Sequence, residues 1–396
     1  MNPQESSAVW LLALGLLLIY AGSFYAFPAL LPMLEAETGW GKPALALGPT
    51  LGTLTMAALT PLTGWVVDRG KGRRMLLVLP AVAALAMAAL AMAPNPWVWW
   101  GGWVVIGAAQ AGAVYETVFS LLTRRLGAEA RPAITRVTML AGLSSTVTFP
   151  LGHWLGATFG GQHAFFGFAA LALFGTLPLY VAAVRRLGPD RAPSQSSQPG
   201  DRGSALWAAL RRPAFWGIAA IFAAVWLDHG LLLTYILPLF HDRGVAAGTA
   251  TLAAACLGPA QLVGRLVLFR GGARLRNAVV TQVSLGLVVV AALLLVAAGA
   301  APLLVFAVVG VQGAGMGLMS IMRPMLLADV LGRRGFGGIS GVAAIAPLLA
   351  SALAPSLGAQ LLAIWGPPGI YVALVLLSGF ALALALAMLR RRPLEG

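Results

Sequence analysis

The chain has 396 residues, of which 59% are hydrophobic and only 10% are charged, and its mean hydropathy is +0.87. This composition excludes an ordinary soluble domain and indicates a polytopic membrane protein. The formal net charge of +14 is large enough to suggest a nucleic-acid partner, and the placement of the basic residues decides that question.

Apolar segments of about 20 residues, the length of helix that crosses ~30 Å of hydrocarbon, recur along the whole chain. We count twelve of them, six in each half. Those of the first half span residues 8–33, 45–67, 74–93, 97–123, 132–155 and 163–184, and those of the second half span 213–240, 247–270, 277–298, 302–331, 335–362 and 367–389. The sequence therefore predicts an all-α membrane protein with twelve transmembrane helices.

The basic residues alternate between the two sides of this predicted bundle. Most of the 26 lysines and arginines fall in alternate loops or near the C-terminus, and the opposite loops hold only Lys42 and Arg243. The positive-inside rule then places both termini in the cytoplasm. We expect the chain to lie in a bacterial-type inner (plasma) membrane. Topology thus explains the positive charge, and we expect no nucleic-acid partner. Residues 1–30 lack the features of a signal peptide, so the first span is expected to be retained.

A polar interval divides the chain into two halves. Residues 185–212 are rich in Pro, Ser, Gln and Gly, which is typical of a linker. It separates an N-terminal six-helix bundle, 1–184, from a C-terminal six-helix bundle, 213–396. Basic runs of the two halves align at offsets of about 200 and 209 residues, which favours two parallel six-helix pseudo-repeats.

The densest cluster of charges, GWVVDRGKGRRM at residues 64–75, lies between the second and third apolar segments. It resembles the signature Gly-x-x-x-Asp-Arg-x-Gly-Arg-Arg of the major facilitator superfamily, with one glycine displaced by one position. The matching residues are Gly64, Asp68, Arg69, Gly72, Arg73 and Arg74. A phosphate-binding loop is excluded because Trp65 and Gly72 occupy positions where it needs Gly and Ser or Thr.

The resemblance implies a secondary transporter that works by alternating access. In the superfamily the signature acts as a conformational latch against the start of helix 11, which here reads GFGGISG at residues 335–341. Asp68 can accept hydrogen bonds from basic neighbours or from the backbone N–H groups of that helix start. The alternative is simple positive-inside topology, which arginines alone would satisfy, so Asp68 favours the latch.

Charged residues within apolar spans are costly, so each is a functional candidate. Arg323 lies ten residues before Arg333, which places it ~15 Å from the cytoplasmic face, near the bilayer centre. We expect it to bind an anion; the alternative is a structural pair with a nearby carboxylate. Glu116 lies at nearly the same depth in span 97–123, the fourth of its half, as Arg323 does in span 302–331, the fourth of the other half. Glu116 is a candidate proton carrier, a counter-ion of Arg323, or both.

The seventh predicted span, residues 213–240, carries two further candidates for proton coupling. Asp228 and His229 are adjacent, so their side chains point about 100° apart and at most one faces a central cavity squarely. The alternative is a hydrogen bond between helices. Four tyrosines are candidates for contact with the substrate, with packing in the core as the alternative: Tyr20, Tyr25, Tyr115 and Tyr235.

Arg265, in the eighth predicted span (residues 247–270), narrows the resemblance to one branch of the superfamily. GW at residues 39–40 after the first span, together with DRGKGRRM, looks like the monocarboxylate porters and the oxalate/formate-type antiporters. Helix 8 of that branch carries a substrate-binding arginine, which Arg265 matches. The aspartate that precedes it by four residues in the monocarboxylate porters is replaced by Gln261, and no Lys occurs beyond Lys71 to match the oxalate-type lysine.

Together these residues predict a transporter for a small organic anion, a carboxylate, bound by Arg323 with help from Arg265. Proton coupling through Glu116, Asp228 or His229 is expected as a second step. The alternative within transporters is an efflux antiporter for drugs or another toxic solute. We expect no enzyme activity, because no nucleophile with a base and no metal site share one depth. No cofactor is expected, and the chain is expected to act as a monomer in the lipid bilayer.

Overall fold

The computed structural model describes residues 2–188, 207–271, 276–332 and 336–389. For some residues within these ranges, Asp68 and Glu116 among them, it describes the backbone alone. The described residues form helices, short turns and no strand. The chain divides into two compact units, Met1–Gln195 and Ser196–Gly396. Most of the predicted linker, 185–212, lies outside the described residues.

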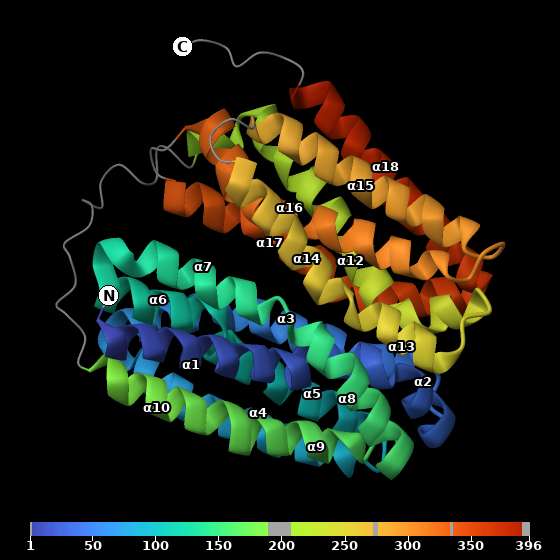
Figure 1. Cartoon of the computed structure of the whole chain (residues 1–396), viewed down its shortest axis with the longest axis horizontal. Coiled ribbons are helices and arrows are strands. Elements are labelled where there is room, and N and C mark those ends of the chain that lie inside the picture. The colour runs from blue at the N-terminus through green and yellow to red at the C-terminus, as the bar shows by residue number, and fades with distance from the viewer. Residues whose placement is uncertain (1, 189–206, 272–275, 333–335, 390–396) are drawn as a thin grey trace. The chain divides into compact units, whose positions relative to one another are not determined.

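The first unit contains helices interrupted by short π-helical and 3₁₀ segments (Figure 1). In chain order they are α1 (Pro3–Tyr20), η1 (Ala21–Tyr25), α2 (Ala26–Thr38), α3 (Lys42–Val66), η2 (Val67–Lys71), α4 (Gly72–Ala91), α5 (Pro96–Ala113), α6 (Tyr115–Leu126), η3 (Gly127–Glu129), α7 (Ala130–Ala141), α8 (Ser144–Phe159), α9 (Ala164–Ala170), η4 (Leu171–Thr176) and α10 (Leu177–Leu187).

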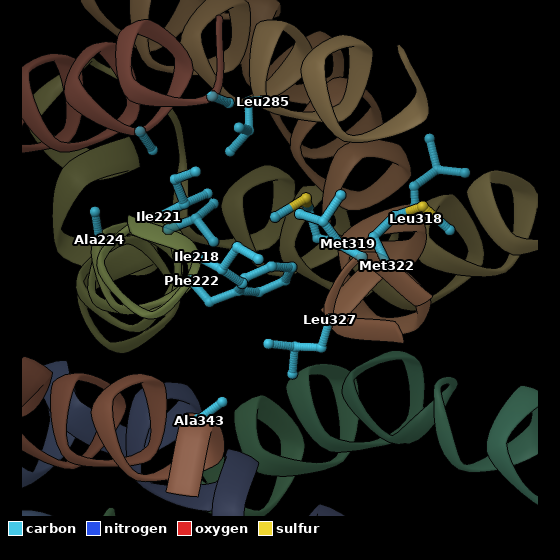
Figure 2. Close-up of a cluster of buried hydrophobic side chains, with 14 of the residues drawn as sticks. Ile218, Ile221, Phe222, Ala224, Leu285, Leu318, Met319, Met322, Leu327 and Ala343 are labelled. Atoms are coloured by element: carbon cyan, nitrogen blue, oxygen red, sulfur yellow. The ribbon is translucent and has the colours of Figure 1, made fainter. Parts of the chain in front are cut away.

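The second unit includes several longer helices. Its elements are α12 (Pro213–Asp242), α13 (Ala247–Ala255), α14 (Leu257–Gly271), α15 (Asn277–Ala297), α16 (Leu304–Leu331), α17 (Phe336–Trp365) and α18 (Pro367–Leu389). A cluster of buried apolar side chains, including Ile218, Phe222, Leu285, Met319 and Met322, joins α12, α15 and α16 (Figure 2). This cluster packs α12, which carries Asp228, against α16, which carries Arg323.

Within the described ranges, 11 helical segments are long and apolar enough to cross a membrane. The predicted span missing from that set is 132–155. It is divided into α7, of 12 residues, and α8, of 16 residues, by a turn at Gly142 and Leu143, so neither piece alone reaches across the hydrocarbon. The prediction of an all-α membrane protein with the twelve-helix fold is confirmed, although the predicted span 132–155 is split into two helices that are each too short to cross the membrane.

Glycines bring corresponding helices together in both units. A Cβ atom built on Gly107 of α5 would overlap the backbone carbonyl of Gly52 in α3. In the second unit, a Cβ on Gly317 of α16 would overlap the carbonyl of Gln261 in α14 in the same way. Small residues that let helix backbones touch are a common way of packing in membranes, where the hydrophobic effect does not drive association. Helices α3 and α5 belong to the second and fourth spans of the first half, and α14 and α16 belong to those of the second half. The two halves therefore share one kind of contact, as parallel repeats require.

We expect alanine at Gly107 or Gly317 to lower the free energy of unfolding by about 3 kcal/mol, because each new methyl group forces two helix backbones apart. Gly101 of α5 and Gly310 of α16 are the matched controls, since a Cβ there meets no atom within 4 Å and alanine favours helix. Thermal unfolding of the four variants in detergent makes the comparison. Equal melting temperatures for the two pairs would contradict the contact.

Candidate functional site

A buried carboxyl group in the second unit forms a hydrogen bond between two helices. Asp228 of α12 and Gln312 of α16 are each only 1% exposed. Gln312 Nε2 donates to Asp228 Oδ2 at 3.1 Å. Asp228 Oδ1 and His229 Nδ1 are both buried and have no hydrogen-bond partner within the described parts of the chain. The carboxyl group is thus fixed through one oxygen, while the other oxygen remains open to a proton or a ligand.

The first unit contains an uncharged version of this contact. Gln110 of α5 donates Nε2 to the carbonyl of Ser23 at 3.0 Å and to Ser23 Oγ at 2.8 Å. Ser23 lies in η1, and its hydroxyl donates to the carbonyl of Ile19. In each unit, then, a buried glutamine on the fourth helix of the half bonds to the first helix. The partner is a serine in one unit and an aspartate in the other.

Both glutamines were missed in the sequence analysis, which considered only charged and aromatic side chains within the spans. A signal was available, because an amide is itself costly to bury in an apolar span without a partner. Gln110 and Gln312 lie in equivalent predicted helices, so comparing polar residues between the halves would have found them.

Arg323 lies on the same face of α16 as Gln312. The two residues are eleven positions apart, which is three helical turns and a rotation of only about 20°. Their Cα atoms are therefore separated by ~16 Å along the helix axis. Arg323 is half-buried, and it lies in the segment Leu304–Leu331, which is apolar enough to cross the membrane.

Arg265 belongs to the helix packed directly against α16. Its neighbour Gly264 lies so close to α16 that a Cβ there would overlap the carbonyl of Ala314. Arg265 is half-buried and within the membrane-spanning segment Ala247–Leu268. The structure thus packs the helices of Arg265 and Arg323 against each other within one unit.

Three of the four candidate tyrosines belong to one aromatic cluster in the first unit. The rings of Tyr20 and Tyr115 are 5.1 Å apart between centroids, and Tyr25 contacts this pair through Phe24. The backbone is irregular on both sides of the cluster: η1 is π-helical, and helix α5 breaks from α6 at Val114. Interrupted membrane helices are typical of sites where backbone and side chains face a pathway.

The fourth tyrosine is a packing residue. Tyr235 is fully buried, its hydroxyl donates to the carbonyl of Pro355 in α17, and its ring fills the space beside Gly358. Both the hydroxyl and the ring thus make contacts within the protein. These contacts fit packing in the core, the alternative to contact with a substrate.

Two predicted groups cannot be placed. The side chains of Asp68 and Glu116 lie outside the described residues, as does Gly335 at the glycine-rich start of helix 11, whose next residues form the first turn of α17. The backbone around the signature is described, and Gly70 adopts a φ of +77°, a conformation that favours glycine, within the irregular segment η2. Among the described residues, no group of three or more His, Cys, Asp or Glu could hold a metal ion.

The sequence of residues 12–310 matches the model of the Major Facilitator Superfamily. The chain belongs to this superfamily. Among solved structures, it is similar to a mutant of the nucleoside transporter NupG, with a TM-score of 0.75 and 11% identity over 98% of this chain and 99% of that one. It is also similar to a bacterial homolog of the human lysosomal transporter Spinster in an inward-facing, occupied conformation, with a TM-score of 0.73 and 14% identity over 98% of both chains.

A more similar sequence carries a different kind of name. The "Transcription regulatory protein OpdE" of Pseudomonas aeruginosa is 25% identical over 326 residues, which are 79% of this chain and 77% of that protein. The superfamily and its transporter structures make this superfamily member a secondary transporter and not an enzyme. It binds a small-molecule substrate and sits in the lipid bilayer as an integral membrane protein.

We expect Tyr235→Phe to lower the free energy of unfolding by about 1 kcal/mol, the usual net value of one hydrogen bond, and to leave substrate affinity unchanged. The measurements are the melting temperature in detergent and the half-saturating concentration of any transported substrate. Tyr115→Phe, in the aromatic cluster, is the comparison. A weaker substrate affinity in Tyr235→Phe with an unchanged melting temperature would return Tyr235 to the site.

Proposed function

We propose that this superfamily member carries a small organic anion, a carboxylate, by alternating access, with Arg323 as the principal ligand and Arg265 as its assistant. The observation that carries the proposal is the placement of both arginines in membrane-spanning segments of two helices in backbone contact, α14 and α16. A guanidinium within the bilayer is costly unless an anion compensates it. Its planar fork also matches a carboxylate with two parallel hydrogen bonds.

The same residues support the branch of monocarboxylate porters and oxalate/formate-type antiporters over other members. Arg265 stands where that branch holds its substrate-binding arginine, and Gln261, four residues earlier, is buried at the contact with α16. Because Gln261 replaces a carboxylate, the proton would have to be carried elsewhere. Glu116, Asp228 and His229 are the candidates, so symport or antiport with protons is part of the proposal.

Tyr20, Tyr25 and Tyr115 are proposed as further contacts of the substrate. Gly64, Asp68, Arg69, Gly72, Arg73 and Arg74 are proposed as the conformational latch. The transporter is proposed to lie in the inner (plasma) membrane with both termini in the cytoplasm, to act as a monomer, and to bind no nucleic acid.

Counterflow in proteoliposomes tests the anion site. Vesicles preloaded with mono- and dicarboxylates, amino acids or cationic drugs are assayed for uptake of the labelled compound at two pH values. We expect a carboxylate to exchange, and Arg323→Gln to slow that exchange 10- to 100-fold, because a hydrogen bond to a charged group contributes about 1.5–3 kcal/mol. Arg323→Lys should lose less, since it keeps the charge but not the fork.

Arg270→Gln is the matched control, because Arg270 is an exposed arginine in the last turn of α14. Undiminished carboxylate exchange by Arg323→Gln would contradict the proposal. Exchange of cationic drugs that survives this substitution would instead support the second transporter class, an efflux antiporter with Arg323 in a structural role.

A further inference from the structure

We infer that Asp228 is the proton carrier of the transport cycle and that Gln312 positions it by holding Oδ2, so that the proton binds at Oδ1. The inference rests on the proposed function, which leaves Glu116, Asp228 and His229 open as carriers. It selects one of these and adds a positioning residue on the neighbouring helix.

The two units supply an internal comparison. Gln110 and Ser23 hold the first and fourth helices of the first unit together without any charge, and Ser23 Oγ lies 2.8 Å from Gln110 Nε2. The helix contact in the second unit therefore needs only a neutral acceptor. An aspartate at this place adds the cost of a buried carboxyl to a contact that serine makes equally well. That cost is explained if the carboxyl group does chemistry that a hydroxyl cannot do at the pH of a cell.

Within the described part of the chain, Asp228 has no cation to compensate it. No ion pair of Asp228 is found among these residues, and α13 and α17, which pack against α12, carry no titratable side chain there. On α18 the titratable group is Tyr371, whose hydroxyl donates to Asp242 at 2.7 Å. On α16 the charged groups are Arg323, ~16 Å along the axis from Gln312, and Asp329.

The other titratable groups on these helices are occupied elsewhere. Asp329 accepts a hydrogen bond from Asn277 Nδ2 at 2.7 Å, near the last turn of α16. On α12 itself, Tyr235 bonds to Pro355, and His241 lies at the far end of the helix. The group next to Asp228 is His229, whose Nδ1 is also buried and unpartnered in the part of the chain that the structure describes.

These contacts define a proton-transfer step. A proton from water on one side of the membrane forms an O–H bond at Asp228 Oδ1, which neutralises the carboxylate while Gln312 still donates to Oδ2. The bond breaks when the site opens to the other side, and the proton passes to water, either directly or through His229 Nδ1. No electrons are transferred, and each cycle moves one proton in addition to the charge of the cargo.

The experiment combines a transport assay with a spectroscopic one. Asp228→Ser gives the second unit the serine–glutamine pair of the first, and Asp228→Asn keeps the side-chain volume. For both we expect accumulation driven by a pH gradient to fall to the level seen without a gradient, whereas counterflow, which needs no gradient, falls less than about threefold. The melting temperatures report whether the variants fold.

The spectroscopic arm needs no substrate. Infrared difference spectra between acid and alkaline pH, with protein labelled by ¹³C at the aspartate carboxyl carbon, show the carbonyl band of a protonated aspartic acid and distinguish it from Glu116. We expect the labelled band in the wild type and its loss in Asp228→Asn. Gln312→Leu should shift the pH midpoint of the band, because it removes the donor to Oδ2. Gln110→Leu removes the equivalent uncharged contact and should leave the midpoint in place.

Gradient-driven accumulation that survives in Asp228→Asn, or a wild-type spectrum without a labelled band assigned to Asp228, would overturn the inference. If no anion exchanges but the band is present, the proposed cargo fails while Asp228 stands as a proton-binding group. If the Asp228 variants do not fold, the wild-type band and its shift in Gln312→Leu decide the matter alone.

Discussion

Hydrocarbon gives a polar group no water, so every charged or hydrogen-bonding side chain inside the membrane must meet a partner, a proton or a cargo. In the second unit this requirement accounts for the amide of Gln312 on Asp228 and for the hydroxyl of Tyr235 on Pro355. When the partner of such a group is always another protein group, the pair holds two helices together. When the partner is a proton or a cargo, it is present for only part of the transport cycle, and the group can take part in transport.

Close backbone contact decides which groups share a helix interface. With no hydrophobic drive to bring helices together in lipid, α14 and α16 meet through glycines that admit no side chain. Gln312 and Arg323 share one face of α16 because they are eleven residues apart, and Arg265 lies on the adjacent helix α14. The glycines add that these two helices lie close enough for their backbones to touch.

Much of this arrangement can be predicted from the sequence, and the failures have identifiable causes. Membrane spans are found reliably because about 20 apolar residues are needed to cross the bilayer, and the helix bounds lie within a few residues of the predicted ones. The break at Gly142 and Leu143 was not foreseen, because both residues also fit an uninterrupted apolar helix. For Tyr235 the sequence left substrate contact and packing open, because a one-dimensional pattern cannot show that Gly358, more than a hundred residues away, leaves space for its ring.

The two halves show how a repeated fold can acquire separate tasks. Both keep the glycine contact between the second and fourth helices and the glutamine bond between the fourth and first, so the repeated framework has been retained. The two units differ in the side chains that they add to this framework. The first unit has aromatic rings beside interrupted helices, and the second has arginines and an aspartate in its helices. An aromatic surface contacts a cargo without fixing its charge, whereas arginine and aspartate respond to anions and protons. The glutamine of the first unit meets a serine and that of the second meets an aspartate. Under the proposal made for Asp228, this one difference turns a contact between helices into a group that binds a proton.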